Sequence, residues 1–241
     1  MKEKNTSNKD ISIQIQEGLS KDANNYNNEL YKLVKPHVGK DILEVGCSIG
    51  NITKLLIKKN NRIAGIDVVK DSIRIIKKNF VKRKNFEAHV MDASNSKILS
   101  MFNHKFDTII CMNVLEHIKG DNKTLRNFHK LLDKRGLVIL ICPAFQFLYG
   151  SVDASDKHYR RYTARGLKVM VEKAGFRIID LHYINFPGMF GWYINGKILK
   201  KKMVDSSSLR FYDKIIPIFF GMEKIIHPPM GLSVFCVAEK I

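Results

Sequence analysis

The chain has 241 residues, of which 45% are hydrophobic and 27% charged, a balance that fits a globular protein and excludes a disordered or collagen-like chain. Its 41 Lys and Arg outnumber its 23 Asp and Glu, which gives a formal net charge of +18. The positive electrostatic field of such a charge attracts phosphates, nucleic acid or an anionic membrane surface. A compositional preference for Lys and Asn explains the excess of positive charge equally well.

The cysteines and the apolar segments indicate the compartment. The four cysteines lie far apart, with no CxxC pair and no Cys/His cluster, so we expect no disulfide framework and no metal site. The first residues have no apolar signal region, and the longest apolar run, IIPIFF at 215–220, is too short to span a bilayer. We therefore expect a cytoplasmic protein.

The first elements in chain order are a loose segment and a helix, followed by alternating strands and helices. Residues 1–25 are polar and rich in Asn, so we expect them to be loose, with an N-terminal flap as one possible use, and we expect a helix over 26–35. Beyond Asp41, short Ile- and Val-rich runs alternate with amphipathic segments, as in a parallel sheet with crossover helices. The expected strands are 41–46, 62–67, 86–91, 106–112 and 136–142. The expected helices between them are 50–59, 71–82, 95–103 and 121–133, and Gly136 is expected to end the last one.

The rest of the chain completes the sheet around an interruption. An irregular stretch, 143–162, precedes a helix over 163–173, a sixth strand over 176–184 and a final strand over 231–239. Residues 185–230 predict two helical stretches, 189–203 and 207–226, that form a cap over one end of the sheet. The predicted organisation is an N-terminal segment, 1–35, a core of 36–184 plus 231–241, and a cap insertion, 185–230.

Three successive strand ends carry the residues of a nucleoside site. DILEVGCSIGNIT, 41–53, is a strand followed by a turn with Gly46 and Gly50, where the backbone can approach a ligand closely, although a plain strand-to-helix connection looks the same. The second strand ends in GIDVV, where the Asp67 carboxylate can accept both ribose hydroxyls. The third ends in MDAS, where Asp92 can accept a hydrogen bond from an adenine amino group.

These segments resemble motifs of the class I S-adenosylmethionine-dependent methyltransferases. EVGCSIG, GIDVV, MDA, FDTIICMNVLEHI and GLVILICPA are similar to five motifs in that family's order, with Ser48 at a position where a third glycine is more common. The resemblance implies an α/β, Rossmann-like seven-stranded sheet with its last strand antiparallel and helices on both faces. It also implies the donor S-adenosylmethionine, with S-adenosylhomocysteine as product. The donor contacts that it implies are Glu44, Gly46, Cys47, Gly50, Asp67, Val68, Asp92, Ala93, Asn113 and Val114.

Two other kinds of chemistry fit the sequence less well. A nicotinamide enzyme would place a pyrophosphate on a GxGxxG turn, which GCSIGN lacks, and the acidic pair Glu44 and Asp67 suits a cationic sulfonium better. Cys142-Pro143 reverses the order of the Pro-Cys nucleophile of cytosine methylation, so we interpret this thiol as a buried one.

The candidates for proton transfer come from two segments. His117, in CMNVLEHI, has a side chain whose ordinary pKa allows it to take a proton from a hydroxyl or amine, although LEH is also a common structural helix start. The segment 145–163 follows the fifth strand and resembles the LYG…HYRRYT stretch of a bacterial methyltransferase subgroup. His158 or Tyr159 is the second candidate there.

The same segment supplies candidates for holding the acceptor. Arg160 or Arg161 can hold an acidic group, and Tyr149 and Trp192 complete the predicted acceptor site. The alternative is that these arginines pair with Asp153 and Asp156 for purely structural reasons.

The predicted function is methyl transfer to an oxygen or nitrogen of a small-molecule, natural-product or lipid-like acceptor, mainly by alignment of donor and acceptor. The aromatic, lysine-rich cap can line a pocket, form a dimer face or contact an anionic membrane. RNA methylation, or RNA binding without chemistry, is the alternative that the net charge of +18 leaves open.

Overall fold

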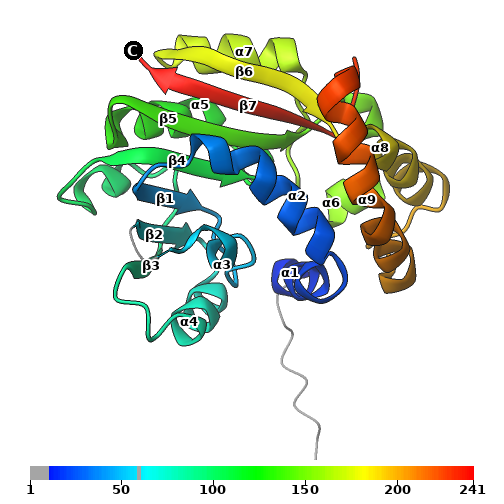
Figure 1. Cartoon of the computed structure of the whole chain (residues 1–241), viewed down its shortest axis with the longest axis horizontal. Coiled ribbons are helices and arrows are strands. Elements are labelled where there is room, and N and C mark those ends of the chain that lie inside the picture. Colours follow the sequence, from blue (N-terminus) through cyan, green and yellow to red (C-terminus); the bar gives the residue numbers. More distant parts are fainter. Residues whose placement is uncertain (1–10, 59–60) are drawn as a thin grey trace, which may run out of the picture.

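A seven-stranded sheet forms the centre of the molecule in the computed structural model, which describes residues 11–58 and 61–241 (Figure 1). The strand order is β3-β2-β1-β4-β5-β7-β6, and β7 runs antiparallel to both of its neighbours while the other pairs are parallel. This is the predicted fold class. The strands are β1 (Asp41–Val45), β2 (Arg62–Asp67), β3 (Phe86–Val90), β4 (Phe106–Met112), β5 (Leu132–Pro143), β6 (Phe176–Ile184) and β7 (Ser233–Lys240).

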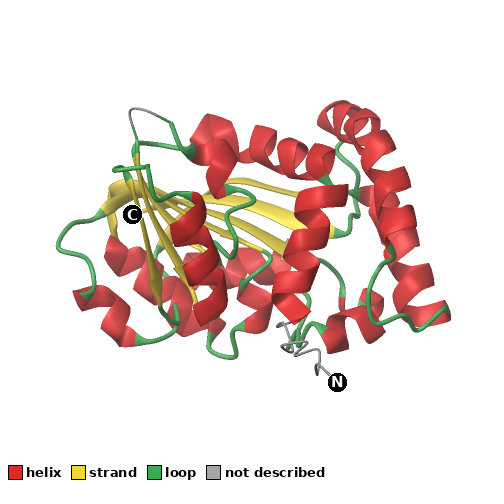
Figure 2. Cartoon of the chain, turned by 90° about the horizontal axis from the view of Figure 1, so that it is seen from below, coloured by secondary structure: helices red, strands yellow, loops and turns green. Residues whose placement is uncertain are grey.

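Helices cover both faces of this sheet (Figure 2). The α-helices are α1 (Ile11–Asp22), α2 (Asn24–Val34), α3 (Thr53–Leu56), α4 (Lys70–Asn79), α5 (Asp121–Leu131), α6 (Ser151–Ser155), α7 (Ala164–Lys173), α8 (Phe186–Tyr193) and α9 (Ser206–Ile226). Shorter helical turns are η1 (Lys35–His37), η2 (Ser96–Ser100), η3 (Leu115–His117), η4 (Gln146–Leu148) and η5 (Ile194–Ile198), the last of which is a π-helix. No helix of the described chain is both long enough and apolar enough to cross a bilayer.

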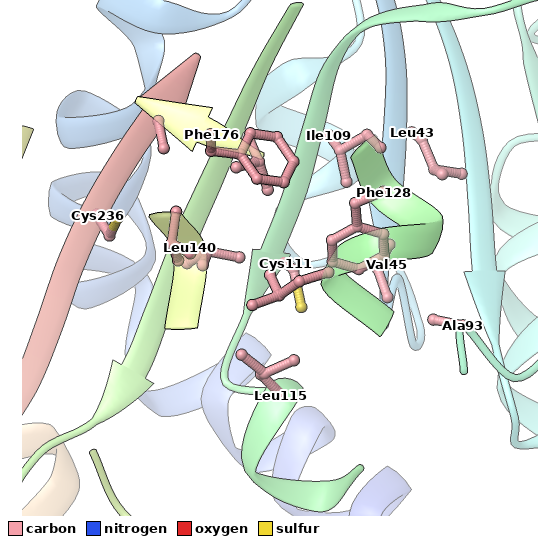
Figure 3. Close-up of a cluster of buried hydrophobic side chains, with 14 of the residues drawn as sticks. Leu43, Val45, Ala93, Ile109, Cys111, Leu115, Phe128, Leu140, Phe176 and Cys236 are labelled. Carbon is pink, nitrogen blue, oxygen red and sulfur yellow. The ribbon is translucent and has the colours of Figure 1, made fainter. Parts of the chain in front are cut away.

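The core follows from the alternation of side chains along strands that are buried on both sides. In β4, Ile109 and Cys111 face α5 and α7, whereas Ile110 faces α2 and α9. Figure 3 shows the first cluster, in which Phe128 of α5 lies near Cys111 of β4 and Val45 of β1. Burial on both faces is why these strands read as continuous apolar runs in the sequence.

The N-terminal prediction is wrong for the residues that the structure describes. Residues 11–22 form helix α1 instead of a loose segment, and Ile13 is buried. Residues 1–10 of the predicted segment lie outside the described residues. The polar composition of this segment did not indicate helix α1, whose apolar side packs against α2 and α9.

Three predicted helices differ in extent. The helix expected over 50–59 shrinks to α3, and the one expected over 95–103 is the short turn η2. The helix expected over 121–133 ends at Leu131, and Gly136 lies inside β5 instead of ending the helix. The physical reason is that Leu132 is buried and pairs with Phe106 of β4, so the strand starts early and bulges before it continues.

The segment between β6 and β7 contains α8, η5 and α9. Helix α9 lies against the sheet: Ile216 and Phe220 are buried in the same cluster as Val34 of α2 and Phe235 of β7. Helix α8 begins where β6 ends, and the carboxylate of Glu223 in α9 accepts hydrogen bonds from the amides of Asn185 and Phe186 at 2.8 and 2.7 Å. These contacts fix α8 beside the carboxyl ends of the parallel strands (Figure 1).

Candidate functional site

The loops after β1 and β2 are joined through one carboxylate. Asp67, at the end of β2, accepts a hydrogen bond from the amide of Ser48 at 3.0 Å and one from the amide of Val69 at 2.8 Å. The amide of Gly46 donates to the carbonyl of Ile66 at 2.8 Å, which keeps the first loop beside the second strand. The carboxyl ends of β1 and β2 therefore form one rigid edge.

Gly46 sits where the first loop passes the end of β4. Its φ is +75°, and a Cβ atom at this position would lie 2.2 Å from Cγ2 of Val114. Gly50, with φ of +96°, has a different reason to be glycine, because its Cβ would lie 2.7 Å from a ring carbon of Phe80. Gly50 thus serves packing between the loop and the end of α4, whereas Gly46 allows close approach of two strand ends.

Two other residues of these loops adopt left-handed backbone conformations. Ser48 has φ of +44°, and Asn113, directly after β4, has φ of +51°. Ser48 is the position at which the resemblance led us to note a missing glycine, and its conformation is one that glycine adopts without strain.

Two predicted donor contacts of the first strand point inward. The Cys47 side chain is buried over Gly65, in a cluster with Ile73 and Ile76, so its thiol is not available to a ligand and only its backbone remains a candidate. Glu44 is also buried; it accepts a hydrogen bond from the Thr53 hydroxyl at 2.6 Å, and burial raises its pKa to about 7. We interpret Glu44 as a residue that holds the Gly-rich loop in place through its hydrogen bond with Thr53.

The end of β3 continues the same edge. The amide of Met91 donates to the carbonyl of Asp67 at 2.9 Å, and the exposed Asp92 accepts hydrogen bonds from the amide and hydroxyl of Ser94, both at 2.8 Å. Val68 is 65% exposed and Ala93 is buried. Gly46, Asp67 and Asp92 therefore lie along one edge of the sheet, in the arrangement that a nucleoside site requires, and their contacts to a donor stay a prediction.

The helices predicted over 26–35 and 207–226 correspond to α2 and α9, but the sequence did not predict α1 or the contacts that these helices make with this edge. The Asn51 side chain in the Gly-rich loop donates to the carbonyl of Gln16 in α1 at 2.8 Å. Tyr26 of α2 is partly buried, its phenol hydrogen-bonds with the Asn113 side chain, and the loss of solvent around it raises its pKa to about 12. Asp213 of α9 accepts hydrogen bonds from the amides of Asn25 and Tyr26, at 3.1 and 2.8 Å, and so holds the start of α2 in place. The only available signal was Tyr26 at the start of the predicted helix.

A buried charge network lies at the ends of β4 and β5 and centres on Asp153 of α6. This fully buried carboxylate accepts hydrogen bonds from Arg161 at 2.7 Å, His158 at 2.9 Å and Trp192 of α8 at 3.0 Å. Arg161 also donates to the carbonyl of Ala144 at 2.9 Å, and its side chain is 1% exposed. The prediction that Arg161 holds an acceptor is therefore wrong in this structure, and its structural pairing with Asp153 is the correct alternative.

His158 is held on both sides of its ring. Besides Asp153 at Nδ1, the ring has Oδ2 of Asp156 at 3.3 Å from Nε2. Burial disfavours the charged imidazole, but these carboxylates outweigh burial and raise the pKa of His158 to about 9. A ring so occupied is a poor proton acceptor, which contradicts its predicted role as general base. Tyr149 fixes the backbone here, because its hydroxyl donates to the His158 carbonyl at 2.8 Å.

Glu116 and His117 complete this network. Glu116 is fully buried, and neither carboxylate oxygen accepts a hydrogen bond from any described residue. Burial raises the pKa of Glu116 to about 7. The ring of His117 stands edge-on to that of His158, with centroids 4.6 Å apart, and burial lowers its pKa. His117 is about one third exposed, so it is the network's most accessible imidazole.

The other predicted acceptor residues lie at the rim of the network. The guanidinium of Arg160 pairs with Asp121 and donates to the carbonyl of Lys119 at 3.2 Å. The side chain of Tyr159 is 57% exposed, while its amide donates to the carbonyl of Glu116 at 2.9 Å. The Trp192 ring packs against the Arg161 guanidinium, 5.0 Å from ring centroid to guanidinium carbon.

The cysteines take no part in either region through their thiols. All four are free and buried, and burial raises the pKa of the Cys142 thiol well above its ordinary value. This agrees with the rejection of Cys142 as a nucleophile.

Comparison with known proteins gives a family and a fold. Residues 21–181, about two thirds of the chain, match the family model described as "Methyltransferase domain". A relative from Coxiella burnetii, named ubiquinone biosynthesis O-methyltransferase, is 28% identical over 121 residues, which cover 50% of this chain and 47% of that protein. The chain thus spans about half the length of this curated relative.

Solved structures agree on the fold. A S-adenosylmethionine-dependent methyltransferase from Archaeoglobus fulgidus superposes with a TM-score of 0.59 at 17% identity, over 89% of this chain and 93% of that one. The [4+2]-cyclase SpnF superposes with a TM-score of 0.60 at 18% identity, over 88% of this chain and 79% of that one. One fold therefore serves different chemistry. The predicted methyltransferase superfamily is confirmed at the level of the family by the match of residues 21–181.

Proposed function

We propose that this chain, which belongs to the methyltransferase domain family, transfers the methyl group of S-adenosylmethionine to a hydroxyl oxygen of a small or lipid-like acceptor. The observation that carries the proposal is the shared edge of Gly46, Asp67 and Asp92, where the strand ends approach closely and carboxylates gather. The name of the Coxiella burnetii relative supports an oxygen rather than a nitrogen as the acceptor.

The donor side of the proposed site fits a cation. Asp67 and Asp92 bring carboxyl groups to the ends of two adjacent strands, and a sulfonium ion is favoured by nearby negative charge. When bound, S-adenosylmethionine supplies a methyl carbon that the acceptor oxygen attacks as the carbon–sulfur bond breaks and the sulfonium becomes a thioether. Asn113 and Val114, at the end of β4, are the residues that we assign to the wall beside the methyl group.

The acceptor side of the proposed site lies next to the buried charge network. We assign its lining to His117, Tyr159, Arg160 and Trp192, and its cover to the cap, 185–230. The proton that the acceptor hydroxyl loses goes to His117, the most exposed imidazole of the network. The chain contributes mainly alignment of oxygen, carbon and sulfur, which removes much of the entropic cost of a two-substrate reaction.

We further assign the chain to the bacterial subgroup with an LYG…HYRRYT segment. The support is that each conspicuous residue of that segment has a partner: Asp153 binds the amide of Gly150 at 2.9 Å and the ring of His158 at 2.9 Å, and Tyr162 donates to the carbonyl of Leu115 at 3.2 Å. Gly150 also allows close contact with η5, because a Cβ there would lie 2.7 Å from the carbonyl oxygen of Gly196.

Calorimetric titration with S-adenosylhomocysteine tests the donor site. We expect micromolar or tighter binding to the wild-type protein, and at least tenfold weaker binding to Asp67→Ala, which removes the carboxylate that joins two loops. Asp71→Asn on α4 is the control, because Asp71 is 63% exposed and pairs with Arg74 one turn along the same helix. Absence of heat with both the donor and its product would refute the proposed function, and methyl transfer from tritiated donor to bulk RNA would refute the small-molecule acceptor.

A further inference from the structure

We propose that Glu116, His117, His158 and Asp156 form a binding site for one divalent transition-metal ion, with Zn²⁺ the best match. One ligand atom from each of Glu116, His117 and His158 lies within 4.8 Å of the other two. Oδ2 of Asp156 lies 3.3 Å from Nε2 of His158 and 3.9 Å from Nε2 of His117. Ligand atoms that share an ion at bond lengths near 2.1 Å are roughly 3–4 Å apart, so little movement is needed.

Glu116 lacks the partner that such a buried group requires. The residue is fully buried, and neither of its oxygens accepts a hydrogen bond from a described residue. A buried carboxylate without a partner is strongly disfavoured, and buried charges are normally paired or coordinate metals. An ion between Glu116 and the two imidazoles supplies the missing partner.

The surroundings of His158 resemble the support that metal-binding histidines receive. Nδ1 of His158 lies 2.9 Å from Oδ1 of Asp153 and keeps its proton there, so a bound ion would displace the proton of Nε2, which faces Asp156 at 3.3 Å, and take its lone pair. Asp153 itself is fixed by Arg161 at 2.7 Å and by Trp192 at 3.0 Å. The orientation of the imidazole is therefore set by two layers of hydrogen bonds.

Charge and donor type identify the class of ion. Glu116, Asp153 and Asp156 bring three carboxylates, and Arg161 is their only permanently charged cation within hydrogen-bond or ion-pair contact among the described residues. A divalent ion that displaces the proton of His158 balances the remaining charge. Two imidazole nitrogens with carboxylate oxygens favour Zn²⁺ and similar transition metals over Mg²⁺ or Ca²⁺, which prefer oxygen ligands alone.

The site is open on one side. The side chain of Glu116 is fully buried, whereas those of His117 and Asp156 are 33% and 26% exposed. An ion would enter between these two and keep a coordination position toward the acceptor side. If the proposed function is correct, an acceptor hydroxyl bound there would lose its proton more readily, because metal-bound oxygens have lowered pKa values.

No spacing of residues in the sequence predicts this site. The expectation of no metal site rested on the spacing of cysteines and histidines, whereas these ligands come from η3 and from the segment after α6. The two segments meet because the amide of Tyr159 donates to the carbonyl of Glu116 at 2.9 Å.

The experiment is metal binding to the full-length chain. Protein treated with chelator and dialysed is titrated with ZnCl₂ by calorimetry, and a Co²⁺-loaded sample is followed by its visible absorption, which reports nitrogen and oxygen ligands directly. We expect one ion per chain. Glu116→Gln should weaken Zn²⁺ binding at least tenfold and still fold, because the native carboxylate oxygens accept no hydrogen bond from the described chain. His117→Ala is the second variant, and the exposed pair on β3 supplies the control, Glu87→Gln, whose carboxylate lies 2.9 Å from His89.

The outcomes separate this inference from the proposed function. Equal Zn²⁺ affinity of the wild type, Glu116→Gln and His117→Ala, or no saturable binding to the wild type, would overturn the site. S-adenosylhomocysteine binding is measured on the same samples. Protein that binds the ion but not the nucleoside refutes the proposed function alone, whereas protein that binds the nucleoside but not the ion refutes the metal site alone.

Discussion

The two halves of the carboxyl edge are built in different ways. The ends of β1, β2 and β3 are shaped by backbone: left-handed φ values at Gly46 and Ser48, and amides that converge on Asp67. The ends of β4 and β5 are shaped by buried side chains, with Asp153 at the centre of four hydrogen bonds. The first region should therefore respond to changes in backbone freedom, and the second to changes in charge.

The difference follows from what each region is proposed to bind. A nucleoside donor needs a close, constant backbone surface, which glycine turns at successive strand ends provide. An acceptor site differs from enzyme to enzyme, and a network of side chains from η3, α8, α6 and the segment after α6 can be altered without rebuilding the sheet. The network ties α8 to α6 through the hydrogen bond from Trp192 to Asp153.

The largest expected effect tests the charged half. Asp153→Ala removes the partner of Arg161, His158 and Trp192 at once and leaves a buried guanidinium uncompensated. Losing one partner of a buried ion pair costs about 3–5 kcal/mol, and we expect that loss in the free energy of unfolding. Urea denaturation followed by circular dichroism measures it, with Asp71→Asn as the exposed control that should change stability by less than about 0.5 kcal/mol. A change as small as the control's would mean that the network is not what stabilises this half.

The next effect tests the backbone half. Gly46→Ala places a Cβ at a φ of +75° and 2.2 Å from a methyl carbon of Val114. Backbone strain and overpacking each cost about 1–3 kcal/mol, so we expect a loss on the order of 3 kcal/mol together with at least tenfold weaker S-adenosylhomocysteine binding. Gly191→Ala is the control, because a Cβ there meets nothing within 4 Å. Unchanged stability and donor binding in Gly46→Ala would contradict the role given to the backbone.

The sequence was a good guide to the sheet and a partial guide to the site. Strands buried on both faces read as apolar runs, so β1 to β6 were predicted within a few residues, except that β5 starts at Leu132. The strand-end residues Gly46, Asp67 and Asp92 were predictable because parallel strands bring their carboxyl ends to one edge. Local spacing carries this information.

The charged half was less predictable because spacing along the chain does not show which way its side chains point. Arg161 faces Asp153, only eight residues away, and not the acceptor, whereas Tyr26 reaches Asn113 from the N-terminal helix α2. The isolation of Glu116 from hydrogen-bond donors likewise depends on how η3 packs against the segment after α6. No periodicity in the sequence reports such contacts.

A pH experiment sharpens the comparison, because Glu44 is a buried acid in β1, next to the loops that are shaped by backbone. Burial raises the pKa of Glu44 to about 7 in the folded protein, whereas an unfolded glutamate titrates near about 4.3. Between these values the folded state binds more protons than the unfolded state, so this group lowers the free energy of unfolding as the pH rises from about 4.5 to 7. Glu44→Gln keeps an acceptor for the Thr53 hydroxyl and removes the titration. We expect the stability of Glu44→Gln relative to wild type to increase by about 2 kcal/mol across that range, measured by urea denaturation at several pH values. A pH-independent difference would show that Glu44 is ionised in the fold.

The smallest expected effect concerns the residue that departs from the usual glycine. Ser48 has φ of +44°, a conformation that costs a residue with a Cβ about 1 kcal/mol, and its amide donates to Asp67 at 3.0 Å. Ser48→Gly removes the strain in the folded state but adds freedom to the unfolded chain, so the net gain should be at most about 0.5–1 kcal/mol, with S-adenosylhomocysteine affinity unchanged within about twofold. Thermal unfolding and calorimetry measure both quantities, and Ser94→Gly, next to the same edge at Asp92, is the control. If Ser48→Gly instead weakened nucleoside binding tenfold while stabilising the fold, the serine hydroxyl would be a ligand contact. The ends of β1, β2 and β3 would then use side chains as well as backbone to bind the donor, as the ends of β4 and β5 use side chains to hold their charges.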